Sequence, residues 1–156
     1  MTQFLGTHQN RIDAKGRVSV PAPFRVALRA LQDAAGTASG TPPLVLRPSH
    51  AHACIEAWPE PAFRQLTGPL ERLDPFSDDH DDLALALFAN AYPIDMDKEG
   101  RIILPDTLAA HAGLTDTIAF VGLGRVFQIW EPGAVPQRMA EARARARAVR
   151  LPTGPQ

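Results

Sequence analysis

The feature that most constrains this chain is a nine-residue segment that occurs twice. Residues 13–21 read DAKGRVSVP and residues 97–105 read DKEGRIILP, at an offset of 84 residues. Aspartate, glycine, arginine and proline match, and the apolar positions match in kind. The repeat predicts one supersecondary unit used twice and packed against itself about a pseudo-two-fold axis. A duplicated unit with an arginine at its tip suits a repetitive, negatively charged ligand such as DNA.

Each copy has the pattern of a strand, a tight turn and a return strand. In the first copy these are residues 7–13, 14–16 and 17–20, and in the second copy 92–97, 98–100 and 101–104. Gly16 is expected to supply the positive φ that a short hairpin loop requires. The proline that ends each copy stops the strand and suits the first turn of a helix.

The remaining segments predict a mixture of helices and strands. Phe24, Ala27, Leu28 and Leu31 have the spacing of an amphipathic helix, and a loop is expected over 33–43. Other expected elements are strands at 44–46 and 54–58, helices at 59–73, 77–91, 105–112 and 136–150, and a hairpin over 117–130.

The net charge of −1 hides a strong segregation of charge along the 156 residues. Residues 1–30 carry five cationic side chains against Asp13 alone, and residues 138–150 carry five arginines against one glutamate. Residues 56–82 carry eight acidic side chains against two arginines. This distribution predicts a basic binding face with acidic surface elsewhere, or opposite faces that meet between subunits.

The cysteine content and the apolar segments indicate the cellular compartment in which the protein is expected. Cys54 is the single cysteine, which excludes an intramolecular disulfide and suits a reducing cytosol. The first six residues lack the pattern of a signal peptide, and the apolar stretch 83–89 is too short to span a bilayer. A cytoplasmic protein without a membrane partner is expected.

The strand, the Asp-x-x-Gly-Arg turn, the apolar strand and the proline-started helix together resemble the SpoVT/AbrB-type swapped-hairpin DNA-binding domain. Two copies in one chain of this length resemble the MraZ family, as do Phe4-Leu5-Gly6 and residues 123–130. The resemblance implies a β-rich α+β fold in which two AbrB-like swapped-hairpin units form one pseudo-two-fold barrel with flanking helices. The units would span 4–60 and 92–135, with connecting helices at 61–91 and an arginine-rich helix and tail at 136–156.

The same resemblance implies a function. It implies a sequence-specific DNA-binding transcriptional regulator, a repressor of the division and cell-wall gene cluster. Such a protein would bind repeated sites in its own promoter through paired Asp-x-x-x-Arg hairpins. It would act as a ring-like homo-oligomer associated with the nucleoid in the cytoplasm, with double-stranded DNA as its partner.

The candidate DNA-binding residues are cationic side chains of the repeated units. The principal contacts are expected at Arg17 and Arg101, with support from Lys15, Arg11 and Lys98. Asp13 and Asp97 are expected to hold the two arginines in a productive rotamer. A pair of this kind can instead simply fasten its own hairpin. Two copies with neighbouring cations favour DNA contact over that alternative.

The two copies differ at positions that matter for a DNA contact. Glu99 stands where the first copy has Lys15, and Ile103 stands where it has Ser19. The first copy is therefore expected to bind DNA more strongly.

Other classes of function are less well supported. The main alternative is an AbrB-fold protein-interaction module, such as an antitoxin-like subunit. No nucleophile motif or phosphate-binding glycine loop is present, so enzyme activity, a cofactor and a small-molecule substrate are not expected. The acidic run 78–82 suits a helix cap. His50, His52 and Cys54 would share one face of a strand, but a fourth ligand for zinc is missing and no metal is expected.

The arginine-rich C-terminal segment leaves three interpretations open. On a helix, Arg143, Arg147 and Arg150 would share one face that could bind phosphates or an acidic neighbour. The segment could equally be a solvated terminal helix, or it could pair with acidic residues 71–82 of an adjacent subunit.

Overall fold

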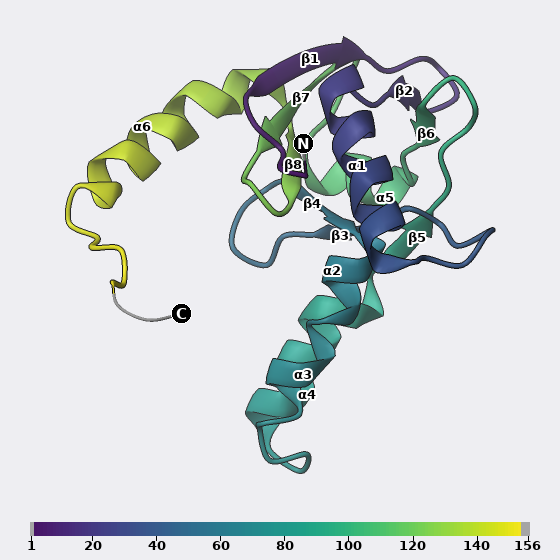
Figure 1. Cartoon of the computed structure of the whole chain (residues 1–156). Coiled ribbons are helices and arrows are strands. Elements are labelled where there is room, and N and C mark those ends of the chain that lie inside the picture. The colour runs from purple at the N-terminus through teal and green to yellow at the C-terminus, as the bar shows by residue number, and fades with distance from the viewer. Residues whose placement is uncertain (1, 154–156) are drawn as a thin grey trace.

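The two halves of the chain follow the same order of elements in the computed structural model, which describes residues 2–153 (Figure 1). The first half contains β1 (Thr7–Arg11), β2 (Arg17–Ser19), α1 (Ala22–Ala35), β3 (Leu44–Pro48) and β4 (Ile55–Pro59). The second half contains β5 (Tyr92–Ile94), β6 (Arg101–Ile103), α5 (Asp106–His111), β7 (Thr117–Gly122) and β8 (Phe127–Trp130).

The strands of the two halves interleave. The main sheet has six strands in the order β1-β7-β8-β4-β3-β5, all antiparallel to their neighbours. The first strand of each half therefore pairs with the third strand of the other half. The second strands, β2 and β6, pair with each other in a separate two-stranded sheet. Exchanging the halves leaves this strand order unchanged, which is the two-fold relation that the repeat predicts.

The predicted α+β class is confirmed, but the predicted closed barrel is wrong. Within residues 2–153, β1 and β5 form the two edges of the main sheet and do not pair with each other. The two strands that flank each repeated turn do not pair with each other as a regular hairpin. Asp13 N donates to the carbonyl of Arg17 at 2.9 Å, and beyond this bond the strands diverge to β7 and β6.

The core lies between the main sheet and the amphipathic face of α1. Phe24, Ala27 and Leu28 of α1 are fully buried, as their helical spacing predicts. The ring of Phe24 lies 5.3 Å from that of Phe4 and 4.9 Å from that of Phe127, so one cluster joins the N-terminus, α1 and β8. The helix continues to Ala35 and ends at Gly36, so the expected loop is confined to residues 36–43.

A helical arm, which connects the two halves in the sequence, projects from the sheet (Figure 1). It contains α2 (Glu60–Arg64), α3 (Thr67–Leu70), α4 (Asp78–Ala84) and the π-helical turn η1 (Leu85–Ala89). The single helix expected over 59–73 is wrong, because Pro69 has no N–H to donate to the carbonyl of Gln65. The cap expected before α4 is confirmed, since Ser77 Oγ accepts the N–H of His80 at 3.1 Å.

Arg47 of β3 fastens this arm to the sheet. Its side chain is 3% exposed, and Nη2 lies 2.7 Å from Oε1 of Glu56. Nη1 donates to the carbonyl of Ala86 in η1 at 3.2 Å. Trp58 Nε1 also donates to Glu56 Oε1, at 3.1 Å. The buried guanidinium is thus both charge-paired and bonded to the arm.

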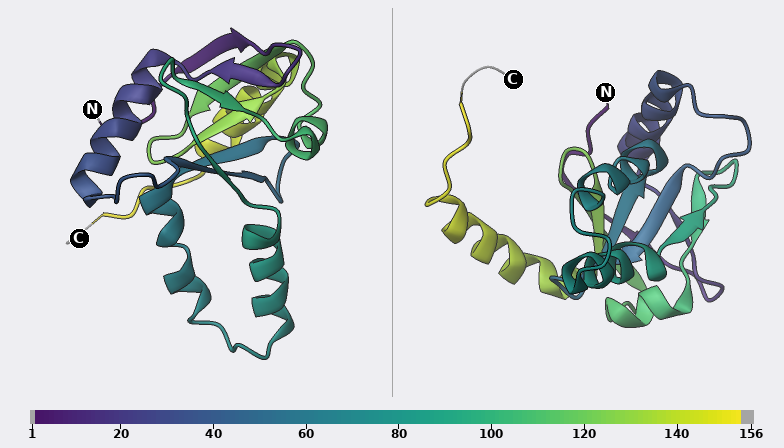
Figure 2. Two further views of the ribbon diagram at one scale, coloured as in Figure 1. Left: turned by 90° about the vertical axis from the view of Figure 1, so that its right-hand side faces the viewer. Right: turned by 90° about the horizontal axis from the view of Figure 1, so that it is seen from below.

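The C-terminal helix α6 (Val135–Ala146) follows a 3₁₀ turn, η2 (Pro132–Ala134), and extends away from the sheet (Figure 2). In its first turn, Val135 packs against Cys54, Ala119 and Trp130. Because α6 ends at Ala146, the expected face shared by Arg143, Arg147 and Arg150 is wrong. Residues 154–156 of the predicted segment 136–156 lie outside the described residues. None of the described helices combines the length and apolarity that a membrane crossing requires.

The buried cluster gives a test of the packing. Phe24→Ala should lower the free energy of unfolding by about 3–5 kcal/mol, because it removes a fully buried ring between Phe4 and Phe127. Val26→Ala, on the exposed face of the same helix, should change it by less than about 0.5 kcal/mol. Urea unfolding followed by circular dichroism measures both; equal losses would contradict the packing described here.

Candidate nucleic-acid interface

Asp13 organises the first repeated turn through both of its carboxylate oxygens. Oδ1 accepts the backbone N–H groups of Lys15 and Arg17, each at 2.9 Å. Oδ2 accepts Nε of Arg17 at 2.8 Å. Gly16 takes a φ of +79° and donates its N–H to the carbonyl of Asp13, which closes the turn as predicted.

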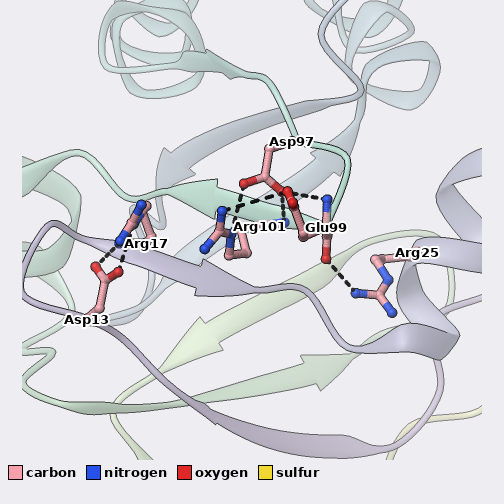
Figure 3. A network of polar contacts seen from close by, with 6 residues as sticks. All are labelled: Asp13, Arg17, Arg25, Asp97, Glu99 and Arg101. Carbon is pink, nitrogen blue, oxygen red and sulfur yellow. Dashed lines mark hydrogen bonds and ion pairs between the residues drawn. The ribbon is translucent and has the colours of Figure 1, made fainter.

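Asp97 repeats this arrangement in the second turn. Oδ1 accepts the N–H groups of Glu99 at 3.0 Å and Arg101 at 2.8 Å, and Oδ2 accepts Arg101 Nε at 2.9 Å. Gly100 takes a φ of +81°. The predicted Asp–Arg pairs are therefore formed in both copies, with closely matching geometry (Figure 3).

These hydrogen bonds stabilise the charged forms of the paired side chains. The backbone N–H of Arg17, followed by its guanidinium, lowers the pKa of Asp13 below 3.8. The backbone N–H of Arg101 is the largest cause of the lowered pKa of Asp97, and the guanidinium adds to it. In return, the hydrogen bond from Asp97 raises the pKa of Arg101 above its usual value.

The two turns are joined by the β2–β6 ribbon. Val18 pairs with Ile102 in its centre, and both are buried. Arg17 lies opposite Ile103, and Ser19 lies opposite Arg101. Since side chains alternate along a strand, these four residues share the other face of the ribbon. The two predicted arginines are thus brought onto one accessible face, where each side chain is more than one-third exposed.

A cavity of about 300 Å³ adjoins this face, and both arginines line it. Its lining includes Arg17 and Arg101 together with Asp97, Met96 and Ile103. Cross-strand hydrogen bonds hold the two turns in register, because Leu104 N donates to the carbonyl of Gly16 and Val20 N donates to that of Gly100, each at 2.9 Å.

The second turn differs electrostatically from the first. Oε2 of Glu99 lies 3.7 Å from Nη2 of Arg101. Arg17 has no acidic neighbour besides Asp13 within ion-pair distance among the described residues, and its turn carries Lys15 instead. The first turn is therefore the more positive of the two.

The three predicted supporting cations lie in the repeated turns or at the end of the strand that leads into the first turn. Lys15 and Lys98 are exposed in the two turns, and Arg11 is exposed at the end of β1. Arg25 of α1 was not among the predicted site residues. Its Nη1 donates to the carbonyl of Glu99 at 3.2 Å, so it fastens α1 to the second turn (Figure 3). Its place on the polar face of α1 was visible in the sequence, but its partner was not.

The structure also tests whether His50, His52 and Cys54 could form a metal site. Residues 50–54 form bends rather than a strand, so the expected shared face for His50, His52 and Cys54 is wrong. No cluster of three potential metal ligands occurs among residues 2–153. Burial raises the pKa of Cys54 to about 12, so the thiol stays protonated and unreactive at neutral pH.

Together these features define a tandem-repeat α+β protein whose halves exchange strands and present paired arginine-bearing turns. The MraZ family model, described as "MraZ protein, putative antitoxin-like", matches residues 87–148. Three relatives named "Transcriptional regulator MraZ" match almost the whole chain. The protein of Gluconacetobacter diazotrophicus is 66% identical over 152 residues, covering 97% of this chain and 93% of the relative. The protein of Gluconobacter oxydans is 58% identical, and the match covers 94% of this chain and 87% of the relative. The protein of Xanthobacter autotrophicus is 40% identical, and the match covers 99% of this chain and 93% of the relative.

The chain therefore belongs to the MraZ family, and the family predicted from the repeated turns is confirmed. Its relatives are named as transcriptional regulators and not as enzymes, which agrees with the expected class of function. The division into segments 4–60, 61–91, 92–135 and 136–156 and the roles of the site residues stay predictions.

The lowered carboxylate pKa values predict how stability depends on pH. The stabilisation from Asp13 and Asp97 is fully present above their unfolded pKa of about 3.8 and is lost as the pH falls through the lower folded values. Between pH 5 and pH 2, wild type should therefore lose more thermal stability than Asp13→Asn/Asp97→Asn. Melting curves followed by circular dichroism measure this.

The matched control is Asp33→Asn/Asp95→Asn, which removes two exposed carboxylates outside the turns. It should keep the wild-type pH dependence. A turn variant whose acid sensitivity equals that of wild type would show that the carboxylates do not stabilise the fold.

Proposed function

We propose that this chain is a sequence-specific DNA-binding transcriptional regulator that contacts DNA through Arg17 and Arg101 on the β2–β6 ribbon. One observation carries the proposal: both arginines lie on the same accessible face of one ribbon, each oriented by an aspartate. A two-stranded antiparallel ribbon has the width to enter the major groove of DNA. Lys15 and Lys98 in the two turns and Arg11 at the end of β1 are exposed and would contact phosphates.

The geometry of Arg17 favours a ligand over a purely structural role. Asp13 fastens the backbone of the turn through Oδ1 and uses Oδ2 for Nε of Arg17. Nη1 and Nη2 of Arg17 make no hydrogen bond within residues 2–153. A guanidinium held by Nε with its terminal nitrogens available can bind a guanine edge or a phosphate bidentately. The aspartates are thus positioning residues.

The finer features of the proposal come from the family. We place the exchanged strands in the swapped-hairpin arrangement of the SpoVT/AbrB type, supported by the pairing of each first strand with the other half. The regulator would repress the division and cell-wall gene cluster from repeated sites in its own promoter. It would act in the cytoplasm on nucleoid DNA as a ring-like homo-oligomer. Repeated sites suit a ring, because each subunit presents the same ribbon.

Gel-shift binding to the DNA upstream of the chain's own gene tests the proposal. Arg17→Ala/Arg101→Ala should lose about 1–3 kcal/mol of binding free energy per arginine and show a shallower salt dependence. It should remain folded, because Oδ1 of each aspartate still accepts the backbone N–H groups of its turn.

The matched control is Arg64→Ala/Arg72→Ala, which removes the same charge from the helical arm. It should bind DNA as wild type does. Unchanged binding by the folded ribbon variant would refute the site. A protein that binds no DNA but co-purifies with a toxin-sized partner would instead support the antitoxin-like alternative.

The unequal turns give a second test. Glu99→Gln should raise DNA affinity on the order of two- to tenfold at low salt, because it removes a negative charge 3.7 Å from Arg101. Glu71→Gln, an exposed change on the arm, should leave the affinity unchanged. Fluorescence anisotropy at two salt concentrations measures both, and the gain at Glu99 should shrink at high salt. Equal behaviour of the two variants would argue against an electrostatic difference between the turns.

A further inference from the structure

Helix α6 is a long basic element with little packing of its own. None of its residues is buried, and Met139, Ala142 and Ala146 continue at helical spacing the apolar stripe that begins at the packed Val135. Arg138 and Arg145 flank one side of this stripe, and Arg143 flanks the other. A helix of this kind gains stability when the stripe is covered and its charges find partners.

The helical arm carries the complementary surface. An open groove of about 530 Å³ follows one face of α4 and η1 and is lined by Asp81, Ala84, Leu85, Phe88 and Ala89. Leu85 in this groove is 62% exposed. Its lining has the spacing i, i+3, i+4, i+7 and i+8, which is the face that a partner helix covers.

The charges of the two surfaces match in sign and position. Asp81 lies in the groove near the beginning of α4, and Asp78 and Asp82 belong to the same helix. The arginines of α6 concentrate toward its end, where Arg143 and Arg145 lie in the last turn. Antiparallel packing would therefore place the basic end of α6 beside the acidic end of α4. The dipoles of the two helices favour the same orientation.

The lengths also match. Helix α6 spans 12 residues, and α4 continues directly into η1, so the arm offers a continuous helical surface over residues 78–89. At 1.5 Å per residue, each is about 18 Å long.

The two surfaces of one chain do not meet. Helix α6 leaves the sheet in a different direction from the arm in Figure 1. Within residues 2–153, no ion pair joins an arginine of α6 to an acidic residue of the arm. The occupant that fits the groove is therefore helix α6 of a second copy.

We infer that copies of this chain associate head to tail, with α6 of one copy seated antiparallel in the α4–η1 groove of the next. This interface rests on the self-association that is part of the proposed function. Because the contact joins two different surfaces, each copy can bind the next one. The assembly closes into a ring when the rotation between neighbouring copies allows it. In this arrangement the acidic arm and the basic helix α6 form the contact between copies, and the β2–β6 ribbon stays available to bind its ligand.

Charge reversal on each side tests this interface by sedimentation-velocity ultracentrifugation of the full chain. Arg143→Glu/Arg145→Glu and Asp81→Arg/Asp82→Arg should each weaken self-association at least tenfold, because like charges then face each other. The four changes combined in one chain should restore it, and so should an equimolar mixture of the two single-sided variants. Circular dichroism verifies that each variant is folded.

Matched controls place the same charge changes nearby. Arg147→Glu/Arg150→Glu lies beyond the end of α6, and Glu71→Arg/Asp74→Arg lies on the arm outside the groove. Both should assemble as wild type does. A second, positional test is Ala84→Cys/Ala142→Cys, which should form disulfide-linked multimers on mild oxidation, whereas each single cysteine variant should not form a chain of more than two copies.

The outcomes separate this interface from the proposed function. A wild-type oligomer that persists in both reversed variants, or an association that the combined variant fails to restore, overturns the interface alone. A wild-type chain that is monomeric at all concentrations overturns the interface and the proposed ring together. If Arg143→Glu/Arg145→Glu weakens binding to promoter DNA while the oligomer is unchanged, α6 is a DNA-contacting element and the interface is overturned.

Discussion

Each repeated turn depends on one carboxylate that serves two purposes. One oxygen of Asp13 or Asp97 accepts two backbone N–H groups, and the other accepts the guanidinium of the arginine four residues later. The hydrogen bonds from the backbone N–H groups to the carboxylate reverse the chain within a few residues. They do so without a β-ladder between the two flanking strands. Those strands are then available to pair with the other half of the molecule. The second bond directs the arginine along the ribbon.

Strand exchange makes each half incomplete without the other. Strand β1 of the first half lies on β7 of the second, and β5 lies on β3. The ribbon that carries both arginines takes one strand from each half. The geometry between Arg17 and Arg101 therefore depends on the packing of the whole molecule and is stable only when both halves are folded.

Much of this architecture could be predicted from local patterns. The spacing of Phe24, Ala27 and Leu28 identified the buried face of α1, and Ser77 marked the start of α4. The paired Asp and Arg residues were also found, because a repeat of charged positions at a fixed offset is visible without any structure. These features depend on residues close together in sequence.

The features that were not predicted depend on contacts between distant segments. A glycine turn between two short strands suggests a hairpin, and nothing local distinguishes it from strands that separate after the turn. The contact between Arg25 and the carbonyl of Glu99 spans 74 positions, so α1 alone could not reveal it. Residues 50–54 form a bend, so the shared face that His50, His52 and Cys54 would have on a strand does not exist.

Carrying both halves on one polypeptide has a consequence for how such a molecule can change. In a dimer of identical half-length chains, every substitution is present twice, so a change that improves one turn is imposed on the other. Here Lys15 and Glu99 occupy equivalent turns, and a substitution at either position leaves its counterpart untouched. The covalent link between β4 and β5 thus frees the two turns from strict symmetry while the shared sheet holds them in one geometry.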